Sequence, residues 1–294
     1  MDTPAMRHVA AVATIVAALA LAGGAAGASA VVPKGDILAV DATFHPLVLD
    51  AHGHVVRRLP SWHVPDGFGL LGIELAPSRN DAFVSLWSGN STLPARIFDV
   101  SLATGARRLV ADGLSPSLSP DGTQLAYLAD RREPNLGLTW LTGLVVRTLA
   151  TGKERTIPFD TAVSLGTPPA LVTNWSPNGV SVALAASDFD LVDTATATSI
   201  ADIPSLGATP SAPAFLDADT VIVETNCCIG RQKLVAVDPH GAHAQPFAEI
   251  SSPVDAIRRI DPDRMLVLDQ LGELLLVSRG KTTVIANGIR AAAR

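Results

Sequence analysis

Residues 117–130 read SLSPDGTQLAYLAD and carry the strongest local signal in the chain. The tetrapeptide Ser119–Gly122 (Ser-Pro-Asp-Gly) suits a tight turn, because proline presets φ at one corner and glycine accepts the positive φ of the next. The apolar residues that follow have the alternation and the turn-bounded length of a β-strand. The stretch therefore predicts two short strands joined by a tight turn.

The same pattern of strand, turn and strand recurs at intervals of about 40–45 residues. Units continue into a second hairpin, whose turn is Ala-Thr-Gly at 103–105 and again at 150–152, so each unit supplies four short strands. This period and this number of strands are typical of β-propeller blades. The units begin at IELAPSRNDAFVSLW (73–87), SLSPDGTQLAYLAD (117–130), TNWSPNGVSVALAAS (173–187), PAFLDADTVIVETN (213–226) and RRIDPDRMLVLD (258–269).

The two ends of the repeat region predict how the ring closes. Residues 35–59 supply three strands of a unit and lack the first one. Near the other end, NGIRAAA (287–293) resembles the inner strand LGIELAP (71–77). We therefore expect the last strand to complete the first blade, which removes an open sheet edge. The sequence predicts an all-β, six-bladed propeller of four-stranded antiparallel blades.

The turn motifs resemble those of a known repeat family. Ser119–Gly122 matches the Ser-Pro-Asp-Gly turn of the TolB-like, or WD40-like (PD40-type), β-propeller repeat well, and Ser176–Gly179 matches it fairly. The match is degenerate at 76–79, 216–219 and 261–263. The resemblance implies a propeller over nearly all of residues 31–294, and it implies no particular activity, since one fold hosts many functions.

The first thirty residues predict export. Arg7 precedes an apolar run over about 9–22, and Ala28-Ser29-Ala30 forms an A-x-A cleavage pattern. We interpret 1–30 as a signal peptide and 31–294 as the propeller domain; the alternative is an uncleaved membrane anchor. The expected location is extracytoplasmic, either secreted or in the periplasm or cell envelope, with no other membrane segment.

Composition narrows the partners. The chain has 22 Lys and Arg against 28 Asp and Glu, a net charge of −6. Nucleic-acid binding depends on clustered basic residues, so a nucleic-acid partner is not expected. The interpretation is a monomer without a cofactor that binds a protein, a peptide or an envelope component.

Loop lengths favour one face of the ring. If the strands of a blade are a to d from the centre outward, the a–b and c–d turns share one face and the b–c and d–a loops share the other. The a–b and c–d turns are tight, whereas long connections are expected at 60–69, 88–94, 130–139, 158–171, 204–212 and 226–231. Binding residues concentrate on loops that a rigid scaffold holds, so the b–c/d–a face is the predicted partner face. Its candidate residues are Arg131, Arg132, Cys227 and Cys228.

Cys227 and Cys228 are the only cysteines of the chain and are adjacent. In an exported protein they form a vicinal disulfide, remain two free thiols, or bridge to another molecule. Adjacent Cα atoms are about 3.8 Å apart, so a vicinal bridge is strained. We favour that bridge as a stiffened loop on the partner face.

A second set of candidates lies on the inner strands. The residues aligned just before each inner-strand hydrophobe are mostly polar, and arginines among them suit an anionic ligand. The alternatives are an internal ion-pair network around a water-filled channel, and an alignment that is wrong by one residue. The channel candidates are Glu74, Asn174, Arg259 and Arg290.

Other motifs are explained by turns. Residues 67–72 spell G-x-G-x-x-G but precede a strand, so we interpret them as a crossing between blades and not as a dinucleotide loop. The pairs His52/His54 and His240/His243 fall in outer turns and lack a third ligand, so no metal site is expected.

The main hypothesis is a non-catalytic binding scaffold. The alternative is a small lactonase-like hydrolase with an axial calcium site that includes Glu74 and Asn174.

Overall fold

The computed structural model describes residues 31–88, 94–133, 138–164, 173–185, 189–196, 198–202, 211–225, 231–238 and 244–294. All regular structure within these ranges is β-strand. The described part of the chain holds no helix of the length and apolarity needed to cross a bilayer.

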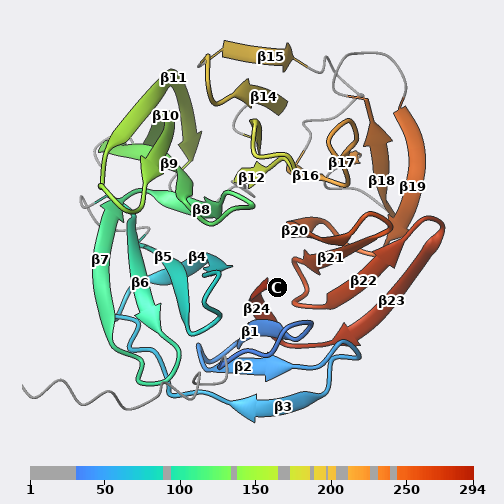
Figure 1. Cartoon of the computed structure of the whole chain (residues 1–294). Coiled ribbons are helices and arrows are strands. Elements are labelled where there is room, and N and C mark those ends of the chain that lie inside the picture. Colours follow the sequence, from blue (N-terminus) through green and yellow to red (C-terminus); the bar gives the residue numbers. More distant parts are fainter. Residues whose placement is uncertain are drawn as a thin grey trace, which may run out of the picture.

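Six four-stranded sheets stand around a central axis, which confirms the predicted fold class (Figure 1). Every strand pairing is antiparallel between neighbours, as short connecting turns require. Blade 1 holds β24 (Ile289–Ala293), β1 (Ile37–Asp41), β2 (Pro46–Leu49) and β3 (Val55–Arg58). Blade 2 holds β4 (Gly69–Leu75), β5 (Asp81–Trp87), β6 (Arg96–Ser101) and β7 (Arg107–Asp112). Blade 3 holds β8 (Leu114–Leu118), β9 (Gln124–Glu133), β10 (Leu138–Thr148) and β11 (Glu154–Ser164).

The remaining three blades follow the same order from the axis outward. Blade 4 holds β12 (Thr173–Trp175), β13 (Ser181–Ala185), β14 (Phe189–Asp193) and β15 (Thr198–Asp202). Blade 5 holds β16 (Ser211–Phe215), β17 (Val221–Thr225), β18 (Gln232–Val237) and β19 (Ala244–Ile250). Blade 6 holds β20 (Val254–Asp261), β21 (Arg264–Asp269), β22 (Leu274–Ser278) and β23 (Lys281–Ala286).

The ring closes within blade 1, as the sequence predicts. Strand β24 pairs antiparallel with β1, with Leu38 opposite Ala293 and Ala39 opposite Ala292. The end of the chain thus provides the innermost strand of the first blade (Figure 1). This pairing satisfies the inner edge of β1, which would otherwise remain open to another chain.

The Ser-Pro-Asp-Gly turn forms as its residues dictate. Ser119 Oγ donates to Asp121 Oδ1 at 2.6 Å and accepts the backbone N–H of Gln124 at 2.9 Å. Gly122 has a φ of +69°, and a Cβ there would stand 2.2 Å from Cγ of Pro77 in the neighbouring blade. Only glycine fits this close approach, so the motif joins two blades as well as two strands.

Side chains of the inner strands also join neighbouring blades. Trp175 Nε1 of β12 donates to the carbonyl of Ser117 in β8 at 3.0 Å, and Thr173 Oγ1 donates to the carbonyl of Ser115. All these groups are buried. Apolar clusters fill the space between blades, and one of them brings Ile257 of blade 6 against the strands of blade 5.

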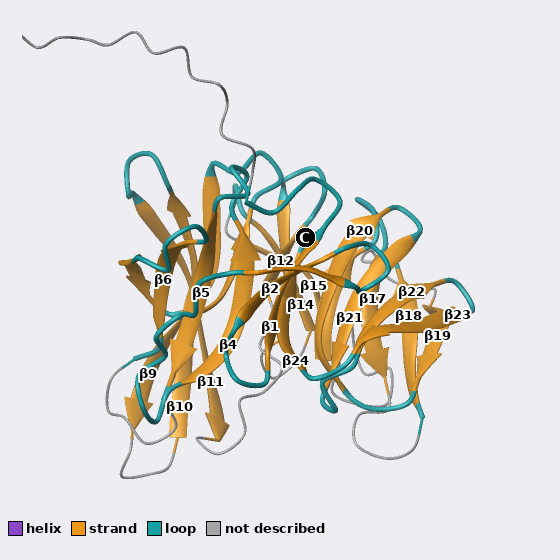
Figure 2. Ribbon diagram, turned by 90° about the horizontal axis from the view of Figure 1, so that it is seen from below, coloured by secondary structure: helices purple, strands orange, loops and turns teal. Residues whose placement is uncertain are grey.

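Blade 3 differs from the expectation of long loops at 130–139 and 158–171. Strands β9, β10 and β11 have 10, 11 and 11 residues, whereas the other strands have three to eight. Their register continues past a bulge at Leu141/Gly143, with Trp140 opposite both Arg131 and Ala162. We call residues 130–133, 138–141 and 161–164 the blade-3 extension (Figure 2). Backbone pairing between β-prone residues such as Thr139 and Trp140 outweighs the charged residues that suggested a loop.

Candidate functional site

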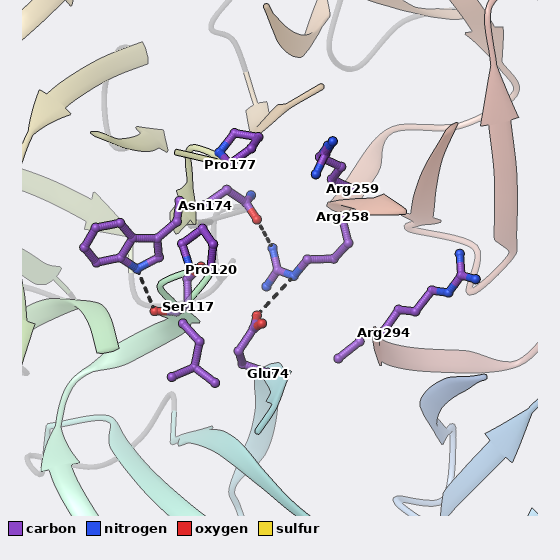
Figure 3. A pocket seen from close by; sticks show the side chains of 11 residues that line it. Glu74, Ser117, Pro120, Asn174, Pro177, Arg258, Arg259 and Arg294 are labelled. Atoms are coloured by element: carbon purple, nitrogen blue, oxygen red, sulfur yellow. Dashed lines mark hydrogen bonds and ion pairs between the residues drawn. The ribbon is translucent and has the colours of Figure 1, made fainter. Parts of the chain in front are cut away.

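A pocket of about 220 Å³ lies on the axis, where the inner strands end (Figure 3). Pro120 and Pro177 of two a–b turns line it, so the pocket is at the short-turn end of the ring. Its polar lining comes from blades 2, 3, 4 and 6 and from the residue that follows β24. These residues are Glu74, Ser117, Asn174, Arg258, Arg259 and Arg294.

Arg258 links three blades across the axis. Its Nη1 donates to Asn174 Oδ1 of blade 4 at 2.9 Å, and its Nε stands 3.7 Å from Glu74 Oε2 of blade 2 (Figure 3). The side chains of Arg258 and Glu74 are 14% and 19% exposed. At 3.7 Å the contact with Glu74 is an ion pair without a hydrogen bond.

Asn174 is held in one orientation. Its Nδ2 donates to the carbonyl of Pro213 at 2.6 Å and, at 3.4 Å, to that of Ile257. Because these bonds hold the amide nitrogen, the amide oxygen of this buried residue accepts the hydrogen bond from Arg258. Blade 4 thereby fixes the guanidinium that blade 6 supplies.

Burial controls the charge of the pocket. It raises the pKa of Glu74 to about 7, although the guanidinium of Arg258 opposes the shift. Burial lowers the pKa of Arg258 while Glu74 raises it, and an arginine stays charged at neutral pH. The raised pKa of Glu74 reduces the negative charge of this carboxyl near neutral pH, while the arginines stay charged, so the pocket is cationic.

The four predicted channel residues do not form one cluster. Glu74, Asn174 and Arg259 all line the pocket. Arg259 is exposed, and its Nε donates to the carbonyl of Leu216 at 2.7 Å. Arg290 lies near the beginning of β24, with its Cζ 5.8 Å from the ring centre of Phe44 in the β1–β2 connection. That connection is a b–c loop, so Arg290 belongs to the opposite end of the axis.

Arg258 is the residue that sequence reasoning missed. Asp217 and Asp261 make the same turn bond, each accepting the backbone N–H of the residue two positions later. Ala214 lies three residues before Asp217, and Arg258 lies three residues before Asp261. If the inner strands are aligned on this turn aspartate instead of on the hydrophobic run, Arg258 occupies the same position as Ala214.

The partner-face candidates are described in part. Arg131 is exposed, with its Cζ 5.9 Å from the ring centre of Trp140 on the opposing strand. Arg132 lies in β9, and its side chain is outside the described residues. Cys227 and Cys228 are also outside them, between β17 and β18, so the vicinal disulfide stays a prediction.

The first histidine pair forms part of an exposed turn, as expected. Asp50 Oδ1 accepts the backbone N–H groups of His52 and His54, and Asp50 Oδ2 is 3.1 Å from the His54 ring. These bonds lower the pKa of Asp50. His240 and His243 are outside the described residues, within which no group of three His, Cys, Asp or Glu is placed to hold a metal ion.

The G-x-G-x-x-G stretch forms no phosphate-binding loop. β4 begins at Gly69, so the second half of the motif is an inner strand and no helix follows it. The structure agrees with a crossing between blades.

No family model and no curated protein matches the sequence. Solved structures match the fold. TolB from Acinetobacter baumannii has a TM-score of 0.61 at 12% identity, over 89% of this chain and 67% of that one. The chain thus has a β-propeller fold similar to that of TolB. A nidogen/laminin complex gives 0.60 at 12%, over 88% and 97% of the two chains. Oligogalacturonate lyase in complex with manganese gives 0.53 at 14%, over 83% and 70%. At these identities the TolB-like likeness concerns the fold alone.

Proposed function

We propose that this protein is an exported, non-catalytic propeller scaffold that binds a protein or peptide partner on its b–c/d–a face. The blade-3 extension supports the proposal, since it prolongs one blade by a three-stranded sheet on that face. Arg131 and Trp140 present a cation over an aromatic ring there, and arginine and tryptophan are enriched among the residues that dominate binding energy.

The extension also offers sheet edges. In the described part of the chain, Thr161–Ser164 of β11 pairs with β10 alone. An exposed edge carries free backbone N–H and C=O groups, which an extended peptide engages by adding a strand. An extended segment of the partner is therefore the proposed ligand of this face. One solved structure with this fold is a chain of a nidogen/laminin complex, which is in keeping with protein binding by a propeller of this kind.

The alternative function, a hydrolase with an axial calcium ion, finds less support in the pocket. Calcium takes six to eight oxygen ligands, mostly carboxylates and carbonyls. Among the side chains of the described lining residues Glu74 supplies the one carboxylate, and it shares the lining with three arginines. The likeness to a manganese-bound lyase thus has no counterpart in the donor set of this pocket.

Export is part of the proposal and has a direct test. Sequencing the N-terminus of the mature protein should give Val31 if residues 1–30 are a cleaved signal peptide. Recovery of the intact N-terminus in the membrane fraction would support the anchor instead.

Partner binding is tested by affinity capture from the extracytoplasmic fraction. The bait proteins are the wild type, a variant shortened within 131–140, and two charge reversals on blade 3. Arg131→Glu changes the extension, and Lys153→Glu changes the exposed c–d turn at the opposite end of the same blade.

We expect one partner to be retained by the wild type and Lys153→Glu, to be weakened by Arg131→Glu, and to be lost from the shortened variant. Equal melting temperatures for the two charge reversals would show that the difference is not caused by unfolding. Capture of the same proteins by all four baits would sink the proposal.

A further inference from the structure

The axial pocket is lined by an arginine whose buried Nε the fold leaves without a hydrogen bond. Arg258 uses Nη1 for Asn174 and for the carbonyl of Ile257. Its Nε is buried and has no hydrogen-bond partner among the described residues. A buried donor without an acceptor is costly unless something else satisfies it. The ion pair with Glu74 is too long, at 3.7 Å, to give this Nε a hydrogen bond.

Arg259 is oriented before any ligand arrives. The bond from its Nε to the carbonyl of Leu216, at 2.7 Å, fixes the plane of the guanidinium beside the pocket. A side chain that is already ordered loses less entropy when it binds. Two consecutive arginines of β20 thus reach one pocket from the strand nearest to the axis (Figure 3).

Size and charge restrict the ligand. At about 30 Å³ per water molecule, 220 Å³ holds roughly seven waters, which suits a small molecule. The charged lining groups are the guanidinium groups of Arg258, Arg259 and Arg294 and the carboxyl of Glu74. Arg294 donates its Nε to the carbonyl of Gly35 at 3.0 Å and lies near Asp36 and Asp261, so its charge is already balanced in part. Arg258 and Arg259, with one titratable acid, make an environment for an anion.

From these observations we infer that the axial pocket is a binding site for a small oxyanion, of the carboxylate or sulfate type, held by Arg258 and Arg259. The planar guanidinium forks match paired oxygens of such a group. The site lies at the end of the axis opposite the blade-3 extension, so it neither requires nor excludes the proposed partner.

Binding at this site is linked to a proton. The oxyanion and the Glu74 carboxylate are both attracted to Arg258, and they repel each other across a small pocket. β20 contributes Arg258 and Arg259, the end of the chain contributes Arg294, and β8 and β12 contribute the uncharged Ser117 and Asn174. Glu74 is therefore the group that takes up a proton when the anion enters. Its pKa of about 7 places this exchange near neutral pH.

The test is equilibrium binding of sulfate and, separately, of succinate to the full chain at pH 6.0 and 8.5 and constant ionic strength. Succinamide is the uncharged control for succinate. We expect saturable binding of at least one anion, no binding of succinamide, and an affinity that falls by up to about tenfold per pH unit above the pKa of Glu74. The two anion arms distinguish a carboxylate ligand from a sulfate-type one.

Variants separate the site from general salt effects. Arg259→Met removes an exposed side chain of the pocket and should weaken binding at least tenfold, whereas Arg290→Met at the other end should leave it unchanged. Glu74→Gln should tighten binding at pH 8.5 and remove its pH dependence. Equal affinities of the Arg259→Met and Arg290→Met variants would overturn the inference, because they would show a non-specific effect of the anion. Absence of saturable binding to the wild type would overturn it as well.

Discussion

The two ends of the axis use arginine in different ways. Arg258 of blade 6 is mostly buried and contacts Glu74 and Asn174 of two other blades. Arg290 of blade 1, the neighbouring blade, is exposed and lies over the ring of Phe44. Both come from inner strands, but Arg258 lies in the second half of β20, whereas Arg290 is the second residue of β24. Position along the strand, more than residue type, therefore decides whether an arginine takes part in a site.

The difference reflects how each end is built. The turns at one end are short, and Gly122 allows contact with Pro77 across blades. Polar side chains of the inner strands meet on the axis at this end. At the other end the blade-3 extension prolongs one blade, which suits contact with a larger partner. A propeller can thus hold a small ligand at one end and a macromolecule at the other.

The largest expected effect comes from removing each arginine in turn. Arg258→Met leaves Glu74 and the Asn174 oxygen buried without their partner and should lower the free energy of unfolding by about 2–3 kcal/mol at pH 8. Arg290→Met changes an exposed side chain and should stay within about 0.5 kcal/mol. Urea denaturation of both variants measures the difference. An equal loss of unfolding free energy in Arg258→Met and Arg290→Met would contradict the difference between the two ends of the axis.

Glu74→Gln examines the charge at the pocket end. Because burial raises the pKa of Glu74 from 4.5 to about 7, the folded protein holds this proton more tightly than the unfolded chain does. The contribution of Glu74 to stability is thus fully present below about pH 4.5, is lost as pH rises toward 7, and is constant above that. Glu74→Gln should remove this loss.

Melting temperatures at pH 5 and pH 8 provide the measurement. The wild type should lose more stability between these values than Glu74→Gln does, and Arg290→Met should behave as the wild type. An identical pH profile for Glu74→Gln and the wild type would contradict the raised pKa.

A pair of glycines gives a smaller effect and compares the packing of the two faces. Gly122 and Gly67 both have positive φ, but an added Cβ at 122 meets Pro77, whereas at 67 nothing lies within 4 Å. Alanine at either position has the cost of a left-handed backbone, about 1 kcal/mol. At Gly122 overpacking adds roughly 1 kcal/mol or more. Urea denaturation should therefore rank Gly122→Ala as the less stable variant, and the reverse order would refute close packing at the short-turn end.

Much of the fold could be predicted from the sequence because its signals are local. A Ser-Pro-Asp-Gly turn needs only its own residues and those next to it, so such turns mark the blades wherever they occur. Ring closure by residues 287–293 followed from their likeness to another inner strand. The blade-3 extension could not be predicted in this way, since the charged run DRRE at 130–133 resembles a loop while its backbone continues a sheet.

The site was predicted less well, for a geometric reason. Glu74 and Asn174 were found because each precedes a turn of the same length. In blade 6 the turn between β20 and β21 is shorter, because Asp261 pairs with Arg264. An alignment on the hydrophobic run therefore selects Arg259 instead of Arg258. Arg290 was aligned by its neighbouring hydrophobe, which says nothing of its distance from the turn. The register within each inner strand depends on β-bulges, and it determines which residues were predicted correctly as part of the site.

Proton uptake during anion binding tests the central claim most directly. Titration of succinate or sulfate, whichever binds, is followed calorimetrically at pH 8 in two buffers of different ionisation enthalpy. We expect the wild type to take up a fraction of a proton approaching one per bound anion, and Glu74→Gln to take up none. Binding without proton uptake by the wild type, or equal uptake by Glu74→Gln, would contradict it.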